Sequence, residues 1–128
     1  MKEPYSTLLS FVSSEGYSLA SQFDVLAGND SIQYWGLPKK ASLQFVSLCE
    51  RYLVPILGGD VVFTTEDGLI HYTGDNWYSN RQDGEDYGTF AKRSYSESYR
   101  FINSYPEFTK DYKPFFFIFV VEEPYSEL

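Results

Sequence analysis

The stretch that decides the fold runs from Val61 to Thr73 and reads VVFTTEDGLIHYT. β-Branched and aromatic residues, which are favoured in strands, stand on both sides of Asp67-Gly68. An Asp-Gly pair between two such runs is a strong hairpin signal, because glycine readily adopts the positive φ angle that a tight turn needs. We therefore predict a β-hairpin over about residues 61–73.

A two-residue turn at Asp67-Gly68 fixes which residues of the hairpin face each other. In this register Phe63 lies opposite Tyr72, and both are expected on the core face of the sheet. Extended to its open end, the same register places Asp60 opposite Asp75. Like charges across a strand pair repel each other. Fraying of the hairpin, backbone N–H donors from the neighbouring turns, or a cation from a partner would each relieve this repulsion.

Helical patterns stand on both sides of the hairpin. Apolar residues recur at helical spacing over about 38–52, with Pro38 at the start, and over about 86–105, which ends before Pro106. A shorter helix is predicted over 5–14, a weak one over 18–27, and a short strand over 31–35. The run FFFIFVV over 115–121 is apolar on both faces, which predicts a buried strand.

These elements predict an α+β fold over the whole chain. We expect residues 1–128 to form one domain, since this length suits a single hydrophobic core. In that domain an antiparallel sheet with a central hairpin (about 61–73) packs against the helices at about 38–52 and 86–105.

The charge of the chain is unevenly distributed. The 128 residues carry a net charge of −8. Between positions 58 and 91 a single basic residue stands against seven acidic ones, which gives that segment −6. Nucleic-acid binding depends on Lys and Arg, so we expect no nucleic-acid partner. A basic protein surface is a suitable partner, although acidic loops that only keep the protein soluble explain the same imbalance.

The sequence offers little for a metal or a membrane. Cys49 is the only cysteine, it falls within a helical pattern, and we expect it to be a buried apolar residue. His71 is the only histidine, and no metal-binding motif surrounds it, so no metal or cofactor is expected. The longest apolar run is too short to span a bilayer, and the residues after Met1 do not resemble a secretory signal. We therefore expect a cytoplasmic protein without a membrane partner.

Two glycines and a tryptophan flank the hairpin. Gly58-Gly59 precede a strand rather than a helix, so they do not form a phosphate loop, and we interpret them as a tight turn or bulge. Trp77 either closes the core or anchors an interface, since tryptophan is frequent in binding hot spots. Asp60 and Asp75, as paired carboxylates, also leave open a small enzyme that uses general acid and base chemistry.

Two motifs in this order resemble a known family. The stretch Ile56-Leu57-Gly58-Gly59-Asp60-Val61 is followed by Tyr72-x-x-Asp75-Asn76-Trp77-Tyr78, by an acidic loop and by a helix that carries Tyr and Ser. Together with Trp35-x-Leu37 before a helix, this arrangement resembles immunity protein family forty of bacterial polymorphic toxin systems. The resemblance covers residues 32–105. It implies a non-enzymatic cytoplasmic antitoxin, without a cofactor, that binds and neutralises a cognate toxin domain.

The resemblance and the acidic segment together give a set of candidate site residues. A basic nuclease is one kind of toxin that an acidic inhibitor suits, because carboxylates occupy a basic cleft as phosphate does. The alternatives are the small enzyme that uses Asp60 and Asp75, and a structural or interaction module. The candidate toxin-binding residues are Asp60, Asp75, Trp77, Glu85 and Asp86. The candidate structural residues are Gly58, Gly59 and Asn76.

Overall fold

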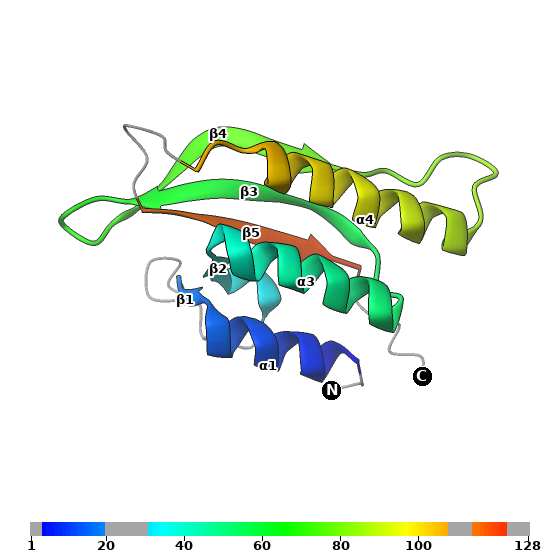
Figure 1. The fold of residues 1–128 in the computed structure, drawn as a ribbon, viewed down its shortest axis with the longest axis horizontal. Helices are drawn as coiled ribbons and strands as arrows, with labels where there is room; N and C mark the ends of the chain where they lie inside the picture. The colour runs from blue at the N-terminus through cyan, green and yellow to red at the C-terminus, as the bar shows by residue number, and fades with distance from the viewer. Residues whose placement is uncertain (1–3, 20–30, 108–113, 123–128) are drawn as a thin grey trace.

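The strands of the chain form one antiparallel sheet in the order β1-β2-β5-β3-β4. The computed structural model describes residues 4–19, 31–107 and 114–122 (Figure 1). The strands are β1 (Tyr17–Ser18), β2 (Trp35–Leu37), β3 (Ile56–Thr64), β4 (Ile70–Tyr78) and β5 (Phe115–Val121). The α+β prediction is confirmed.

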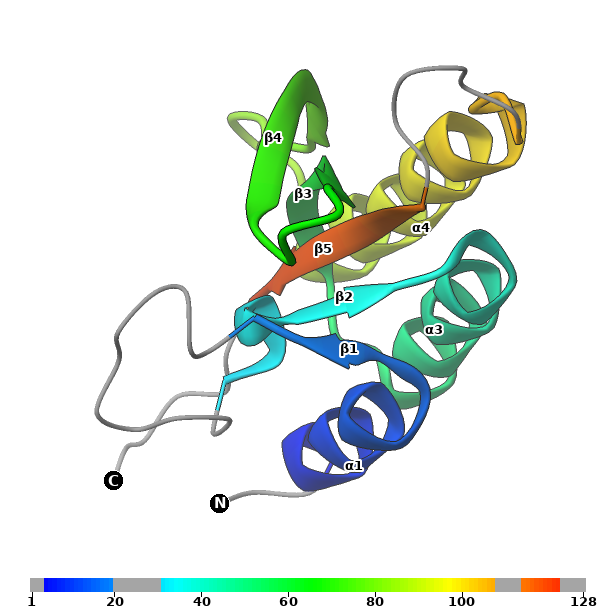
Figure 2. The ribbon, with the colours of Figure 1, turned by 90° about the vertical axis from the view of Figure 1, so that its left-hand side faces the viewer.

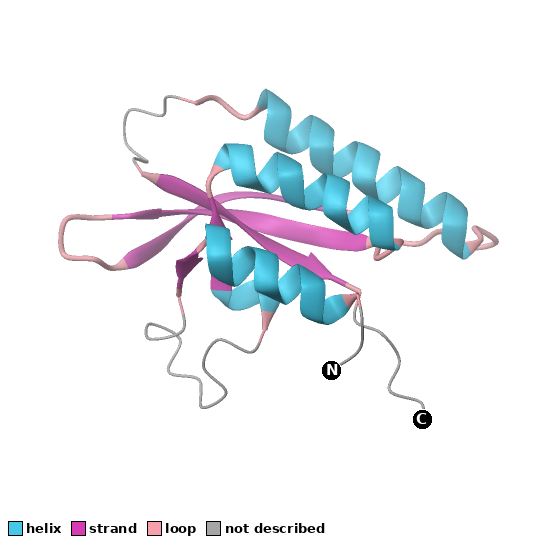
Figure 3. Cartoon of the chain, turned by 60° about the horizontal axis from the view of Figure 1, so that its bottom comes forward, coloured by secondary structure: helices cyan, strands magenta, loops and turns pink. Residues whose placement is uncertain are grey.

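Three helices pack on a single face of this sheet. They are α1 (Tyr5–Glu15), α3 (Lys39–Tyr52) and α4 (Tyr87–Ser104), and a short 3-10 turn, η1 (Ile32–Tyr34), precedes β2. The helices lie side by side on the same side of the strands (Figures 2 and 3). Within the described residues, no helix covers the opposite face. The helices predicted at 5–14, 38–52 and 86–105 are therefore confirmed to within one or two residues.

Local signals explain where the two longer helices begin and end. Pro38 stands at the N-cap of α3, and Leu53 ends that helix in a left-handed conformation with φ 58°. Its backbone N–H donates to the carbonyl groups of Cys49 and Glu50, and Pro55 follows shortly after. At α4 the Asp86 carboxylate accepts a hydrogen bond from the Thr89 N–H, as an N-cap residue does.

The main core lies between the helices and the sheet. This core contains large side chains that are fully buried, among them Phe45, Ile56, Ile102, Phe117 and Phe119. A second, smaller cluster lies on the other face of the sheet and contains Leu19, Val62, Ile70 and Ile118. β5 is the central strand and contributes to both clusters, which explains its uninterrupted apolar sequence.

The hairpin differs from the prediction in extent, place and register. It spans 56–78 and forms one side of the sheet, with β4 as the last strand. The turn has three residues: the Thr65 N–H donates to the Leu69 carbonyl, and Gly68 has φ 83°. The pairing therefore shifts by one residue, so that Tyr72 lies opposite Val62 and not opposite Phe63. Tyr72 is 52% exposed, and its predicted place in the core was wrong.

Two weaker predictions have different outcomes. The strand predicted over 31–35 was mostly wrong, because residues 32–34 form a 3-10 turn and the strand begins only at Trp35. The helix predicted over 18–27 lies largely outside the described residues. Of its described residues, Ser18 belongs to strand β1 (Tyr17–Ser18) and not to a helix.

Truncation of the core should lower stability strongly. We expect Phe45→Ala to reduce the free energy of unfolding by about 3–5 kcal/mol, because Phe45 is fully buried and packs on Phe119 with ring centroids 4.6 Å apart. Tyr99→Ala is the matched control, since Tyr99 is exposed on α4, and it should change stability by less than about 0.5 kcal/mol. Urea denaturation measures both. A loss below about 1 kcal/mol for Phe45→Ala would contradict the assigned core.

Candidate functional site

A bulge in β4 determines where the candidate carboxylates point. Between the pairs Val62–Tyr72 and Asp60–Asn76, residues 73–75 of β4 stand opposite the single residue Val61. The Thr73 hydroxyl spans the bulge: it donates to the Val61 carbonyl at 3.0 Å and accepts from the Asp75 N–H at 2.9 Å.

The bulge separates Asp60 from Asp75. Asp60 pairs with Asn76 on the face that the helices leave open, whereas Asp75 accepts a hydrogen bond at 2.9 Å from the hydroxyl of Tyr105, a core residue at the end of α4. The predicted opposition of the two carboxylates was therefore wrong. Because they point to opposite faces, they do not form the convergent pair that acid and base catalysis would use.

Trp77 lies in the core and joins the hairpin to α4. Its side chain is 8% exposed, and its ring stacks on Phe101 with centroids 4.8 Å apart. The indole Nε1–H donates to the Ser98 hydroxyl of α4 at 2.9 Å. A buried tryptophan needs such a partner for its N–H group. Of the two interpretations of this residue, the structure favours core packing.

The two glycines of β3 make room for that tryptophan. A Cβ atom on Gly59 would lie 2.4 Å from the indole ring and 2.3 Å from the Ile118 carbonyl oxygen. Gly58 has φ 151°, and a Cβ there would lie 2.4 Å from the Trp77 carbonyl oxygen. The glycine pair and the tryptophan thus form one packing unit across β3 and β4, with Gly59 opposite Trp77.

Glu85 and Asp86 both interact within the chain. Glu85 forms a salt bridge at 2.8 Å with Arg93 and accepts the Gln82 N–H at 2.9 Å. These interactions, led by the Arg93 hydrogen bond, lower the pKa of Glu85 to about 2. Asp86 caps α4, and the hydrogen bond from the Thr89 N–H lowers the pKa of its carboxyl. Both acids therefore stabilise the start of α4.

Asp60 differs from these acids because nothing in the described chain pairs with it. Its carboxylate is partly buried and makes no hydrogen bond or ion pair with a described residue. Partial burial raises the pKa of the Asp60 carboxyl. Strand pairing places Asp60 and Tyr72 on the same face of the sheet. Burial, and secondly the Asp60 charge, raise the pKa of the Tyr72 hydroxyl.

Positive charge is absent from the sheet. The five strands contain no Lys or Arg, whereas β3 and β4 contain Asp60 and Asp75, and Glu66 and Asp67 lie at the tip of their hairpin. The described Lys and Arg residues lie on α3, on α4 or in the loop before α4: Lys39, Lys40, Arg51, Arg81, Lys92, Arg93 and Arg100. Within the described residues, the strands and the hairpin tip thus carry acidic but no Lys or Arg side chains, and the Lys and Arg side chains lie on the helices or in the loop before α4.

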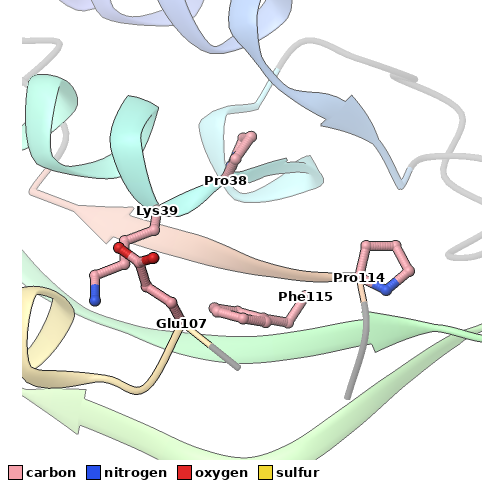
Figure 4. Close-up of a pocket in the computed structure, with 5 residues that line it drawn as sticks. All are labelled: Pro38, Lys39, Glu107, Pro114 and Phe115. Carbon is pink, nitrogen blue, oxygen red and sulfur yellow. The ribbon is translucent and has the colours of Figure 1, made fainter. Parts of the chain in front are cut away.

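Two grooves lie on the helical side. One, of about 500 Å³, is lined by Pro38 and Lys39 at the start of α3, by Glu107, and by Pro114 and Phe115 at the start of β5 (Figure 4). Its lysine donates to the Tyr105 carbonyl at 2.6 Å and so helps to close the end of α4. The other groove, of about 460 Å³, lies between α3 and α4 and includes Glu50, Lys92 and Tyr99. Among the described residues, no group of His, Cys, Asp and Glu side chains is arranged to hold a metal ion.

Comparison with protein families identifies the chain. The family model described as immunity protein 40 matches residues 25–121 and so includes the whole hairpin, α3, α4 and β5. The chain belongs to the immunity protein 40 family. No curated protein and no solved structure matches the chain significantly. In the described part of the chain, no helix has the length and apolarity needed to cross a membrane.

Membership of the immunity protein 40 family confirms the resemblance of the two motifs around the hairpin. In this family member, the motif residues divide into two groups. Gly58, Gly59 and Trp77 pack inside the molecule, whereas Asp60 and Asn76 lie on the open face of the sheet. Sequence reasoning did not mark Tyr72 and Tyr78 as surface residues. A hairpin with a three-residue turn and a β4 bulge would have placed both on that face.

The glycine and tryptophan packing unit yields a stability prediction. We expect Gly59→Ala to reduce the free energy of unfolding by more than about 2 kcal/mol, because its Cβ would overlap both the indole ring and a backbone carbonyl. Gly88→Ala is the matched control: its Cβ would lie 3.7 Å from the nearest atom, and alanine is favoured in a helix. Chemical denaturation of both variants measures the difference. Equal stability of the two variants would refute the packing unit.

The Glu85 salt bridge yields a pH dependence. Its pKa in the folded chain, about 2, is below the ordinary value of 4.5, so its contribution to stability is present above pH 4.5 and is lost as the pH falls toward 2. We expect the melting temperature of wild type to fall more steeply across this range than that of Glu85→Gln. Thermal melts monitored by circular dichroism provide the measurement. Parallel curves for the two proteins would show that the Arg93 pairing does not stabilise the fold.

Proposed function

We propose that the protein is an immunity protein that binds a cognate toxin domain directly and blocks it, without catalysing a reaction. Membership of the immunity protein 40 family over residues 25–121 carries this proposal. Such an inhibitor acts in the cytoplasm of the cell that makes the toxin, and it needs no cofactor. It has to fold before it meets its toxin. The packing unit around Trp77 supports this requirement because it holds the hairpin to α4 through contacts within the chain alone.

The charge distribution supports a basic toxin surface as the partner. Among the described residues, the strands and the hairpin tip carry acidic residues and no Lys or Arg, so the potential there attracts a positively charged surface and repels an acidic one. A basic nuclease domain is one toxin with such a surface. Blocking its phosphate-binding cleft would neutralise it.

The candidate contact residues have unequal support. Asp60 is the strongest, because its carboxylate lacks a partner in the described chain. Asp75 and Asp86 are exposed, but each already accepts a hydrogen bond within the chain, and Glu85 is paired with Arg93. We assign these three to the margin of the contact surface, where charges affect the rate of encounter more than the lifetime of the complex. Trp77 supports the surface from inside and does not contact the toxin.

Expression together with the toxin is the direct test of this function. The gene next to that of this chain is expressed in a bacterial host, alone and with this chain. We expect growth arrest by the neighbouring product alone, normal growth with both, and a stable complex on purification. Continued growth arrest despite folded immunity protein, with no complex, would refute the proposed function.

The acidic surface predicts a salt-dependent association. Attraction between exposed charges is screened beyond about 10 Å at 0.1 M salt. Surface plasmon resonance against the toxin should therefore show an association rate that falls as salt rises, while the dissociation rate changes less. Asp86→Asn should lower the association rate, whereas Glu50→Gln, an acid on the helical side, should leave it unchanged. An association rate independent of salt would exclude electrostatic steering.

A further inference from the structure

Three neighbouring strands align nine residues across the face of the sheet that no described helix covers; of these, Gly58, Val62 and Ile118 are buried, and the others are partly or fully exposed. Strand pairing aligns Gly58, Asp60 and Val62 of β3 each with one residue of β4 and one of β5. Side chains on paired positions point to the same face, and every second residue along a strand returns to it. Across β4, β3 and β5, the three rows are Tyr78, Gly58 and Val120; Asn76, Asp60 and Ile118; and Tyr72, Val62 and Phe116. We call these nine residues the sheet-face grid.

Asp60 occupies the centre of the sheet-face grid. It is the only charged residue of the nine, and the eight around it are aromatic, aliphatic, glycine or amide residues. Tyr78 is 71% exposed and Tyr72 is 52% exposed, and the two stand on either side of Asn76 along β4.

This arrangement has the composition of a binding hot spot. A charge at the centre of a contact surface interacts most strongly when apolar and aromatic neighbours exclude water from it. Tyrosine offers a large flat ring with little conformational entropy to lose, and its ring faces attract a cation. An unpaired carboxylate that the fold partly buries lowers the stability of the free protein, so a partner that pairs with it regains that energy on binding.

We infer that the sheet-face grid is the toxin-docking surface, and that it receives an arginine of the toxin, with the guanidinium on Asp60 and the tyrosine rings beside it. This inference rests on the proposed function. Arginine suits the site because its planar group pairs with a carboxylate through two parallel hydrogen bonds and also stacks on aromatic rings. No Lys or Arg of the strands competes for Asp60, since the five strands contain none.

The decisive experiment compares two sheet variants with two matched variants on the helical side. Asp60→Asn and Tyr78→Ser change the sheet-face grid. Glu50→Gln and Tyr99→Ser remove the same kinds of group from exposed positions on α3 and α4. Surface plasmon resonance against the product of the neighbouring toxin gene should show that Asp60→Asn weakens binding about 30-fold or more, mainly through faster dissociation. Tyr78→Ser should weaken it about tenfold, and the two control variants should bind as wild type does.

A stability measurement separates this role from a structural one. Since the pKa of Asp60 is raised in the folded chain, the charged carboxylate opposes folding at neutral pH, and the opposition disappears as the pH falls through that pKa. Asp60→Asn should therefore melt at the same temperature as wild type or higher at pH 7. A clear drop in its melting temperature would overturn the assignment of Asp60 to binding.

A second readout does not depend on the toxin. Titration of the ¹⁵N-labelled full chain with N-acetyl-arginine amide should shift the amide signals around Asp60 and Asn76 first, and Asp60→Asn should abolish these shifts. Shifts of equal size at exposed acids outside the sheet-face grid, such as Asp83, would overturn the arginine site.

The outcomes with the toxin are distinguishable. If wild type neither binds nor neutralises the toxin, the proposed function fails, and the docking surface fails with it. If wild type binds and both sheet variants bind equally well, only the docking surface is overturned. If wild type forms dimers that Tyr78→Ser dissociates, a second copy of the chain occupies the face and the toxin assignment is overturned.

Discussion

The packing of Trp77 over Gly59 is the contact on which the rest of the structure depends. This contact lies where the hairpin meets α4. The hydrogen bond from the indole N–H to the Ser98 hydroxyl fixes the orientation of the Trp77 ring. Ring contacts with Phe101, Phe117 and Phe119 extend this unit from the hairpin into α4 and the central strand. A side chain at either glycine would overlap β4, so both positions need glycine for β3 to pair with β4 beside the indole ring.

Several acidic residues between positions 58 and 91 have partners within the chain, whereas Asp60 has none among the described residues. Glu85 forms a salt bridge with Arg93, and Asp86 accepts a hydrogen bond from a backbone N–H at the start of α4. Asp67 accepts a hydrogen bond from the Leu69 N–H in the turn. These carboxylates belong to the fold, since their pKa values are lowered by their own partners. Asp60 has no such partner among the described residues, and partial burial raises its pKa. Net charge alone therefore overstates how much negative charge is free to meet a partner.

The sequence predicts the elements of this fold better than their register. The helical periodicity and the positions of the prolines predict the bounds of α3 and α4 to within one residue. The apolar run over 115–121 predicts the bounds of β5. A turn of two residues and one of three are both compatible with Glu66-Asp67-Gly68, and the one-residue difference moved Tyr72 from the core to the surface. A three-residue turn alone already removes the opposition of Asp60 and Asp75. The bulge at 73–75, which places Asp60 opposite Asn76, carries no distinctive signal beyond Gly74 and was not predictable. Charge counts likewise do not reveal that Glu85 is paired, because Arg93 lies eight residues away on α4.

The position of β4 at the edge of the sheet has a consequence for storage of the protein at high concentration. An open edge strand presents unpaired backbone groups that invite another strand to add to it, which is a common route to aggregation. Here the bulge at 73–75 interrupts the regular spacing of those groups. The Thr73 hydroxyl accepts from the Asp75 N–H, and the Asn76 side-chain amide donates to the Gly74 carbonyl. This irregular edge disfavours the growth of fibrils from folded copies of the chain.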